Sequence, residues 1–363
     1  MNILVLSNMG DAHLHAVRWA LETLGHGVAV LDWAGYPRDT CCTIRIKDDS
    51  GARFHGPGLG DKIDVIWNRR LMTPNVRPGT HLADVQVVIR ESVAFRRNAV
   101  VALGDSGTRW VNAPEAARAA EDKVRQLQVA AACGFSIPET IVSNDPDAIR
   151  ELFDRSGGDI IYKPFAPGGW QDGKQISLLA TAALSEAHMA NAESMRKCPG
   201  IYQKNIAKAY ELRVIVMGTR VLAVKLLSQL AAKTLDWRYD IPFEKLPIRE
   251  ASLPEKVRTD CLRFMKSMGL DFGCIDLIYS QDGDYVFLEV NEAGQFLWIE
   301  HLDPSIRMLD IFCSYLTGST ASNPDISIAQ FWKSEAGQAF LAAEKAIKTS
   351  NVESLLISEA SPS

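Results

Sequence analysis

Residues 274–291 read CIDLIYSQDGDYVFLEVN, an alternating pattern that predicts a two-stranded antiparallel ribbon. Asp282-Gly283 is a strong signal for a two-residue turn, and β-branched and aromatic residues flank it. A ribbon closed by this turn places Asp276 directly opposite Glu289, with Asn291 on the same face because strand side chains alternate. The other face is apolar and is expected to point into the core; it consists of Ile275, Leu277, Tyr279, Val286, Leu288 and Val290.

The two facing carboxylates admit two interpretations. Like charges directly opposite each other are unfavourable in a sheet, and a hard divalent cation removes that conflict. Oxygen ligands suit Mg²⁺, so Asp276, Glu289 and Asn291 are candidate metal ligands. The alternative is a solvated polar face on which each carboxylate pairs with a nearby Lys or Arg.

The composition is that of a globular protein. The chain has 363 residues, enough for two or three domains. Its 47% of hydrophobic residues supply ample material for a core. The net charge of −5 provides no general field for polyanions, so nucleic acid is not expected as a main partner.

The cysteines indicate a compartment. They are seven in number, irregularly spaced and without a CxxC pair, which favours reduced thiols in a cytoplasmic protein over a disulfide framework or a zinc site. The apolar run at the N-terminus is too short for a signal peptide, and it carries no positive charge, so no signal peptide is expected. No apolar run reaches the length of a membrane span, so no membrane partner is expected.

The N-terminal third predicts a parallel sheet. Strands are expected at residues 2–7 and 27–32, on either side of an amphipathic helix at 12–24, and again at 63–67. This β-α-β order is typical of a parallel α/β domain. The turn after the first strand lacks the GxGxxG pattern, so a dinucleotide site is not expected.

The rest of the chain alternates between helical and strand patterns. Helices are expected at 116–133, 145–156, 254–268, 304–316 and 326–348, with Asp303 and Pro304 as a helix-start signal. Strands are expected at 139–142, 159–163, 201–203, 212–217 and 221–227, with a glycine-rich loop at 164–174. We expect domains at 1–114, 115–200 and 201–318, followed by a C-terminal helix and flexible tail at 319–363.

Two lysines are candidates for phosphate contacts. Lys163 ends an apolar strand beside the glycine-rich loop, from which its ammonium can reach phosphate oxygens. Lys123 lies in a predicted helix. The alternatives are a surface loop around Lys163 and a solvated or ion-paired helix position for Lys123.

Three further segments carry candidate ligand-binding groups. The connection at Gln203, Lys204 and Ile206 can offer backbone groups to a purine edge, or is an ordinary link between strands. Glu211 and Arg213 share one face of a strand, where they can hold ribose and phosphate or form an exposed ion pair. Asp236 and Arg238 flank Trp237, a combination suited to gripping a polar acceptor or a carboxylate, or to a local turn.

Taken together and in this order, these segments resemble the ATP-grasp superfamily of carboxylate–amine ligases, from about residue 112 to 318. The resemblance implies an ATP-grasp fold built from subdomains at 115–200 and 201–318. The region 1–114 is then a Rossmann-like pre-ATP-grasp domain. The implied cofactors are ATP and one or two Mg²⁺ ions, or Mn²⁺ in their place.

The resemblance also implies a role for each candidate. A helix lysine and a strand-end lysine contact the nucleotide phosphates in this superfamily, and Lys123 and Lys163 match them. The hinge holds adenine largely through its backbone, a carboxylate before the motif arginine binds ribose, and an Asp followed by Glu-x-Asn binds metal. The matching residues are Gln203 to Ile206, then Glu211 with Arg213, then Asp276 with Glu289 and Asn291.

A narrower resemblance is to the microviridin-type peptide cyclases, or graspetide synthetases. The stretch from Glu289 to Glu300, EVNEAGQFLWIE, is similar to theirs, although Glu292-Ala293 departs from a frequent Pro-Asn. Asp236 and Arg238 resemble the motif proposed to engage the acceptor side chain or the carboxylate. Relatives of this kind often form homodimers.

The implied reaction is a two-step ligation. A carboxylate attacks the γ-phosphate of ATP to give an acyl-phosphate, which a hydroxyl or amine then attacks. The implied substrate is a ribosomally made precursor peptide that receives side-chain ester or amide crosslinks. The alternatives are a ligase that adds a free amino acid, as glutamate ligases do, and a nucleotide- or peptide-binding module without catalysis.

Overall fold

The computed structural model describes residues 1–47, 51–60, 62–70, 72–104, 107–165, 168–172, 175–228 and 245–360. They form two compact units. The first contains residues 1–118, 269–272 and 292–363, and the second contains residues 119–268 and 273–291. Among the described residues, no helix is both long and apolar enough to cross a bilayer.

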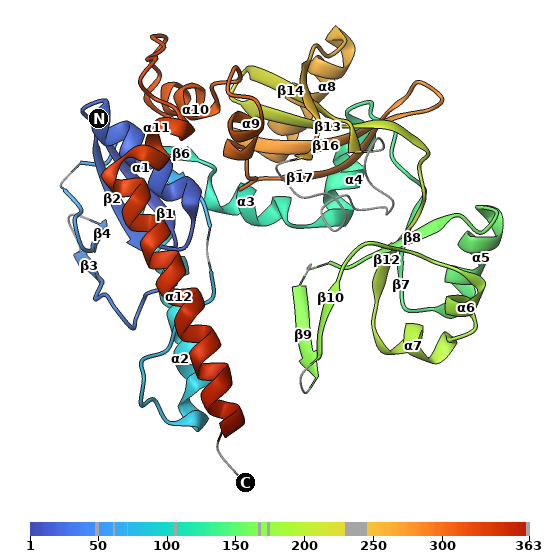
Figure 1. Ribbon diagram of the computed structural model, residues 1–363, viewed down its shortest axis with the longest axis horizontal. Helices are drawn as coiled ribbons and strands as arrows, with labels where there is room; N and C mark the ends of the chain where they lie inside the picture. Colours follow the sequence, from blue (N-terminus) through green and yellow to red (C-terminus); the bar gives the residue numbers. More distant parts are fainter. Residues whose placement is uncertain are drawn as a thin grey trace. The chain divides into compact units, whose positions relative to one another are not determined.

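The first unit contains the parallel sheet that the sequence predicts. Its strands are β1 (Asn2–Ser7), β2 (Gly27–Asp32), β5 (Val65–Asn68) and β6 (Arg109–Val111), in the order β2-β1-β5-β6 (Figure 1). Helix α1 (Ala12–Thr23) joins β1 to β2, and α2 (Leu82–Leu103) joins β5 to β6. A separate hairpin consists of β3 (Thr43–Lys47) and β4 (Gly51–His55).

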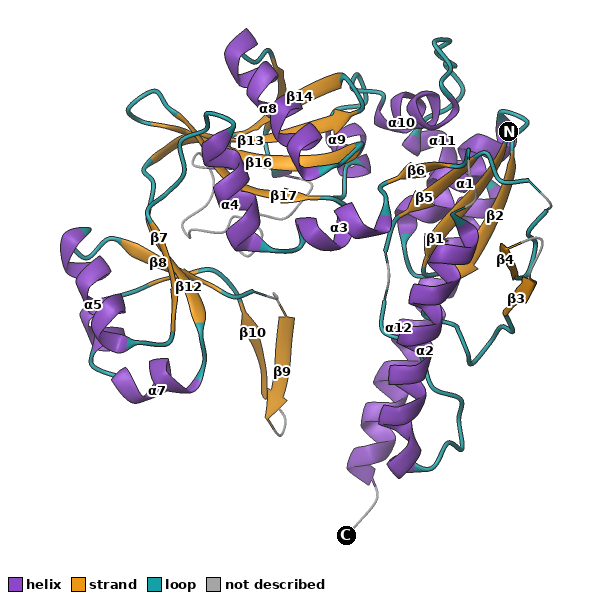
Figure 2. Ribbon diagram, turned by 180° about the vertical axis from the view of Figure 1, so that it is seen from behind, coloured by secondary structure: helices purple, strands orange, loops and turns teal. Residues whose placement is uncertain are grey.

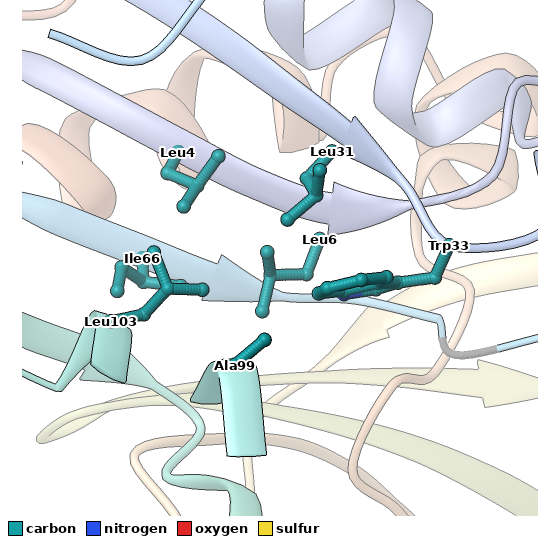
Figure 3. Packing of buried hydrophobic residues seen from close by; sticks show 7 residues of the cluster. All are labelled: Leu4, Leu6, Leu31, Trp33, Ile66, Ala99 and Leu103. Carbon is teal, nitrogen blue, oxygen red and sulfur yellow. The ribbon is translucent and has the colours of Figure 1, made fainter. Parts of the chain in front are cut away.

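Apolar packing fixes α2 against one face of this sheet. Leu4 and Leu6 of β1 and Ile66 of β5 point to the same side, where Ala99 and Leu103 of α2 cover them (Figure 3). Alternate positions of β1 face the opposite side, and Ile3 and Val5 are buried there. The sheet is therefore buried on both faces, as parallel sheets require.

The C-terminal segment completes the first unit with helices α9 (Leu297–Leu302), α10 (Met308–Thr317), α11 (Ile328–Lys333) and α12 (Glu335–Ala360). Helices α10, α11 and α12 all contact α1. The expected single helix at 326–348 is wrong, because Ser334 interrupts it in an extended conformation. Helix α12 continues to Ala360, where the sequence predicted a flexible tail.

The expected helix start at Asp303 is also wrong, because a different carboxylate caps the helices of this region. Asp303 instead forms a local turn, accepting from the backbone N–H of Ser305 at 3.1 Å. The side chain of Glu300 is buried, and its two oxygens accept from the N–H groups of Leu309 and Ile328, each at 2.8 Å. One carboxylate thus caps the first turns of both α10 and α11.

We expect Glu300→Ala to lower the free energy of unfolding by about 2 kcal/mol or more, because two buried N–H groups lose their acceptor. Glu300→Gln keeps one acceptor oxygen and should cost less. Urea denaturation measures both, with Glu335→Ala at the exposed start of α12 as the control. Equal, small effects for Glu300→Ala and the control would contradict the capping role.

The second unit contains two antiparallel sheets. One has the order β11-β8-β12-β7, from β7 (Thr140–Ser143), β8 (Ile160–Lys163), β11 (Ala182–Ala183) and β12 (Gly200–Lys204). Helices α5 (Pro146–Arg155), α6 (Glu186–Met189) and α7 (Ala192–Lys197) contribute to its core. Where the sequence predicted a glycine-rich loop at 164–174, β9 (Gly168–Asp172) pairs in a hairpin with β10 (Gln175–Leu179), which follows that stretch.

The other sheet has the order β15-β14-β13-β16-β17. Its strands are β13 (Lys208–Met217), β14 (Arg220–Leu226), β15 (Ile248–Ala251), β16 (Phe272–Ser280) and β17 (Tyr285–Asn291). Helices α4 (Lys123–Ala132) and α8 (Glu255–Met268) contact each other and pack on this sheet, α4 on β17 and α8 on β13 (Figure 2). This α/β architecture confirms the fold class expected from the sequence.

The β16–β17 hairpin confirms the key pairing but not the expected turn. Asp276 lies opposite Glu289. The loop is one residue longer than predicted, with Ser280 donating to the carbonyl of Asp284 at 2.9 Å and Gly283 at φ +94°. A bulge next to Asp276 offsets the extra residue. The bulge also changes the faces of β17, so that Phe287 is fully buried and Leu288, expected in the core, is only half-buried.

The expected single helix at 116–133 is divided into α3 (Pro114–Ala120) and α4. Asp122 is the reason for the break, because its side chain accepts from the N–H groups of Val124 and Arg125 and so begins a new helix. Lys123 is consequently the first residue of α4.

Candidate active site

The polar face of the β16–β17 hairpin brings the predicted metal ligands together. Asn291 donates from Nδ2 to Asp276 Oδ2 at 3.2 Å and to Glu289 Oε1 at 3.4 Å. If the side-chain amide of Asn291 is flipped, its Oδ1 instead of its Nδ2 faces the two carboxylates. The two orientations differ only in which of the O and N atoms occupies each position. Two carboxylates and one amide oxygen are a donor set that fits Mg²⁺ or Mn²⁺.

Each of these carboxylates also has a cationic partner. The Nη1 of Arg213, on β13, donates to both oxygens of Asp276, at 2.8 and 3.0 Å. The ammonium of Lys123, at the start of α4, lies 2.6 Å from Glu289 Oε2. The pairing with Lys and Arg that the sequence left as an alternative is therefore present, and it surrounds the possible metal ligands with positive charge.

The acids and bases of this cluster perturb one another. Burial raises the pKa of Asp276, although Arg213 opposes the rise. Burial acts in the same direction on Glu289, but Lys123 and Lys163 outweigh it, so that the pKa of Glu289 is lowered. Burial lowers the pKa of Lys163 against the attraction of Glu289, which places the end of β8 in the same electrostatic environment. The three cations of the cluster, Lys123, Lys163 and Arg213, can attract a bound polyanion.

Glu211 and Arg213 share one face of β13, as period-two alternation predicts. Their partners differ, so the exposed Glu211–Arg213 ion pair considered from the sequence does not form. Arg213 pairs with Asp276, and its side chain is 13% exposed. Glu211 accepts from Lys208 and, at 3.4 Å, from the hydroxyl of Ser228.

The predicted hinge segment begins with the last two residues of strand β12, Gln203 and Lys204, and continues to Ile206. Gln203 is buried and donates to Thr140 Oγ1 at 2.9 Å, while its Oε1 has no hydrogen-bond partner among the described residues. Lys204 is exposed, and its N–H donates to the carbonyl of Glu139 at 2.9 Å. Within the described part of the chain the backbone of Ile206 makes no hydrogen bond, so both its groups can pair with a ligand.

Gln126 is a component of this site that the sequence reasoning missed. Its side chain is buried on α4, where Oε1 accepts from the N–H of Val290 at 2.9 Å. Its Nε2 donates to the carbonyls of Val290 at 3.1 Å and Ala120 at 2.5 Å. Val290 lies between Glu289 and Asn291 on the edge strand β17, so Gln126 fixes the metal-ligand strand to the helix that begins with Lys123.

Asp236 and Arg238 lie outside the described residues. Ion pairs, hydrogen bonds and electrostatic interactions within the second unit bring together six of the predicted residues: Lys123, Lys163, Arg213, Asp276, Glu289 and Asn291.

No family model matches the sequence. A probable alpha-L-glutamate ligase of Vibrio vulnificus (strain YJ016) is 26% identical over 265 residues, which cover 71% of this chain and 85% of the relative. A probable alpha-L-glutamate ligase of Shewanella frigidimarina (strain NCIMB 400) is 27% identical over a similar span, covering 71% and 86%.

Solved structures share the fold over most of the chain. The macrocyclase MdnC, bound with precursor peptide MdnA from Microcystis aeruginosa MRC, has a TM-score of 0.76 at 23% identity and covers 88% of this chain and 100% of its own. A Chryseobacterium gregarium RiPP-associated ATP-grasp ligase, in complex with ADP and a leader and core peptide, has a TM-score of 0.74 at 23% identity, covering 88% and 98%. The ATP-grasp ligase PsnB, with minimal precursor, Mg and ADP, has a TM-score of 0.68 at 22% identity, covering 88% and 97%.

The architecture agrees with the ATP-grasp fold of these structures, and the curated relatives are ligases that align with most of the chain. The chain is thus similar in fold to ATP-grasp ligases and in sequence to probable alpha-L-glutamate ligases.

Proposed function

We propose that this protein uses ATP to activate a side-chain carboxylate of a ribosomally made precursor peptide as an acyl-phosphate. A hydroxyl or amine side chain of the same peptide then displaces phosphate, which gives an ester or amide crosslink, ADP and phosphate. The observation that carries the proposal is the cluster of Asp276, Glu289 and Asn291 with the cations Lys123, Lys163 and Arg213.

The cluster suits phosphoryl transfer because that reaction depends on positioning and charge rather than on an enzyme nucleophile. Asp276, Glu289 and Asn291 would hold one or two Mg²⁺ ions, which supply Lewis-acid stabilisation of phosphate oxygens when bound. Lys123, Lys163 and Arg213 offset the negative charge of the polyphosphate and of the transferring group.

The remaining nucleotide contacts follow the same assignment. Glu211 would accept hydrogen bonds from ribose hydroxyls. The backbone of Ile206 and its neighbours Gln203 and Lys204 would pair with the adenine edge, for which the unpaired Gln203 Oε1 offers a further acceptor. The subdomains proposed at 115–200 and 201–318 would enclose this nucleotide.

The peptide substrate is supported by the fold shared with MdnC and with the Chryseobacterium ligase, both of which were crystallised with peptides. Asp236 and Arg238 are proposed to engage the acceptor side chain or the carboxylate. A homodimer is proposed only from the behaviour of similar enzymes.

A second candidate is a ligase that adds a free amino acid to an acceptor. The observation that favours it is the alignment with probable alpha-L-glutamate ligases over 71% of this chain. A third candidate is a nucleotide-binding module without catalysis. It agrees less well with the site, because a module that had lost catalysis would be expected to lose metal ligands, and the acidic and cationic side chains here form a complete set.

One assay separates the three. The purified protein is incubated with MgATP and either the peptides encoded by short open reading frames beside its gene or a mixture of free amino acids that includes glutamate. Phosphate release is measured together with the mass of each peptide. We expect phosphate release that requires a peptide, with the loss of one water molecule from the peptide for each crosslink.

The other outcomes assign the alternatives. Peptide-independent turnover with free amino acids would contradict the crosslinking proposal and favour the second candidate. ATP binding without turnover under every condition would favour the binding module.

A further inference from the structure

Asn112 is a buried residue outside the proposed nucleotide and metal contacts. It directly follows strand β6 and is 1% exposed. Its Oδ1 accepts from the N–H groups of Asp271 and Phe272, each at 2.8 Å. Its Nδ2 donates to the carbonyls of Phe272 at 2.8 Å and Glu292 at 3.1 Å. The amide thus uses both of its N–H groups and both lone pairs of its oxygen, and every partner is a backbone group.

These partners determine the orientation of the Asn112 amide. In the flipped orientation its NH₂ group would face two N–H groups and its oxygen two carbonyls, so all four hydrogen bonds would be lost. The amide also contacts both the N–H and the C=O of Phe272, as a residue of a neighbouring strand does. Asn112 therefore continues the backbone pairing of β16 at its first residue.

The contacts of Asn112 lie at the open end of the β16–β17 hairpin. The pairing of the two strands begins at Cys274 and Asn291. Phe272 is the first residue of β16, and Glu292 directly follows Asn291, the last residue of β17. Beyond the last paired residues, the Asn112 side chain thus links the chain that enters β16 to the chain that leaves β17.

Phe272 is held firmly by the core of the first unit. It is 1% exposed, and its ring centroid lies 5.6 Å from that of Phe296 and 5.3 Å from that of Phe312, both in edge-to-face contacts. Such close-packed side chains have little room to move. Asn112 therefore ties the carbonyl of Glu292 to a segment whose position is set by the core.

Asn291 lies between two residues whose backbone is bound by a buried side-chain amide. On one side, Gln126 accepts from the N–H of Val290 at 2.9 Å and donates to its carbonyl at 3.1 Å. On the other side, Asn112 donates to the carbonyl of Glu292. Strand β17 is the last of its sheet, and an edge strand leaves backbone groups for partners of this kind. The two amides together restrict the backbone of Asn291 from both directions.

We propose that Asn112 is a positioning residue, which holds Asn291 where a bound Mg²⁺ ion requires it. Asn112 acts through the backbone of Glu292 and not through contact with the metal. The inference rests on the metal assignment of the proposed function, and it is independent of the substrate. Residues that orient a metal ligand from behind typically change the metal affinity by about 10- to 100-fold when they are replaced.

The test measures how much Mg²⁺ the full-length protein needs in order to bind ADP. Calorimetric titrations with ADP, in the absence of peptide, are repeated over a series of Mg²⁺ concentrations. The readout is the Mg²⁺ concentration that brings the ADP affinity halfway to its value at saturating Mg²⁺.

Two variants alter the amide to different degrees. Asn112→Leu removes all four hydrogen bonds at nearly the same side-chain size. Asn112→Asp keeps the shape, and burial against two carbonyls favours the protonated carboxyl, which can donate one hydrogen bond in place of two.

Two controls separate positioning from other effects. Glu300→Ala removes the shared cap of α10 and α11 and is expected to destabilise the same unit. Asp271→Asn changes a side chain of the segment that Asn112 contacts. It removes the ion pair with Arg109 at 2.7 Å but keeps the backbone N–H that Asn112 accepts from.

We expect Asn112→Leu to raise the required Mg²⁺ concentration by about tenfold or more, and Asn112→Asp by less. Glu300→Ala and Asp271→Asn should retain the wild-type requirement. Thermal melting should show losses of stability in both Asn112→Leu and Glu300→Ala, so that a changed Mg²⁺ requirement in the first alone reports positioning.

An unchanged Mg²⁺ requirement in both Asn112 variants, or an equal increase in Glu300→Ala, would overturn the proposal. If neither Asn112 variant folds, Asn112 is a determinant of folding, and the positioning role is withdrawn. A wild-type protein that binds no ADP at any Mg²⁺ concentration would contradict the proposed function as well. Wild-type binding of ADP without peptide crosslinking in the ligase assay would leave the role of Asn112 intact, so the two proposals can fail separately.

Discussion

Glu289→Gln is expected to reduce the rate of ATP-dependent ligation by on the order of 100-fold or more. The substitution keeps the shape of the side chain but removes a negative charge from the proposed metal set, and such Lewis-acid stabilisation contributes several kcal/mol. It also removes the carboxylate that pairs with Lys123 at 2.6 Å. The strand should persist, because the backbone pairing of Glu289 with Asp276 does not involve its side chain.

The matched control is Asp282→Asn, which removes an exposed carboxylate from the loop of the same hairpin. Initial rates of ADP formation with the active substrate measure both variants, and thermal melting verifies folding. Wild-type rates for Glu289→Gln at saturating Mg²⁺ would contradict the metal assignment. A loss of similar size in Asp282→Asn would indicate that the hairpin, rather than its polar face, is what matters.

Gln126→Leu is expected to lower the free energy of unfolding by about 4 kcal/mol, the largest loss of stability that we predict. The substitution leaves the N–H and C=O of Val290 and the C=O of Ala120 buried without a partner, and each such group costs roughly 1–3 kcal/mol. Binding of MgATP should weaken as well, since the amide holds Glu289 and Asn291 against the helix that carries Lys123.

Urea denaturation and nucleotide titration measure the two effects. Gln126→Glu should be intermediate in stability, because it keeps an acceptor for the Val290 N–H but loses the donor. Gln128→Leu, on the exposed face of α4, is the control. Equal unfolding free energies for Gln126→Leu and Gln128→Leu would contradict the role of Gln126, and a destabilised protein with unchanged nucleotide affinity would limit that role to folding.

The pairing of Asp276 with Glu289 could be predicted from the sequence, but the length of the loop and the bulge that together produce this pairing could not. Alternation and the Asp282-Gly283 turn signal placed Asp276 opposite Glu289, and the structure has the same pair. The longer loop and the bulge compensate each other in register, and both depend on how the hairpin packs. Phe287 shows this dependence, because its ring lies 4.8 Å from that of Phe264 on α8 and occupies the core position expected for Leu288.

Interactions between distant segments could not be predicted in the same way. That Glu211 and Arg213 share a face follows from strand periodicity, but the choice of Asp276 as the partner of Arg213 depends on the pairing of β13 with β16. Gln126 carries no sequence signal beyond its place on a helix, because its partner is a backbone segment that the fold brings to it.

Helix ends illustrate a competition that local patterns do not resolve. Asp303 and Pro304 match a helix-start signal, yet α10 begins at Met308. The buried carboxylate of Glu300 satisfies the first N–H groups there, while Asp303 makes a turn with Ser305. By contrast, Asp122 caps the start of α4 in a stretch whose helical pattern is continuous, so the sequence predicted one helix where the structure has α3 and α4.

The acyl-phosphate is tested most directly by following oxygen from the substrate carboxylate. The substrate found in the ligation assay is prepared with ¹⁸O in its side-chain carboxylates and incubated with the protein and MgATP. Mass spectrometry then measures ¹⁸O in the released phosphate. The account predicts one ¹⁸O atom in phosphate for each bond formed, together with ADP. Unlabelled phosphate alongside product formation, or the formation of AMP, would contradict it.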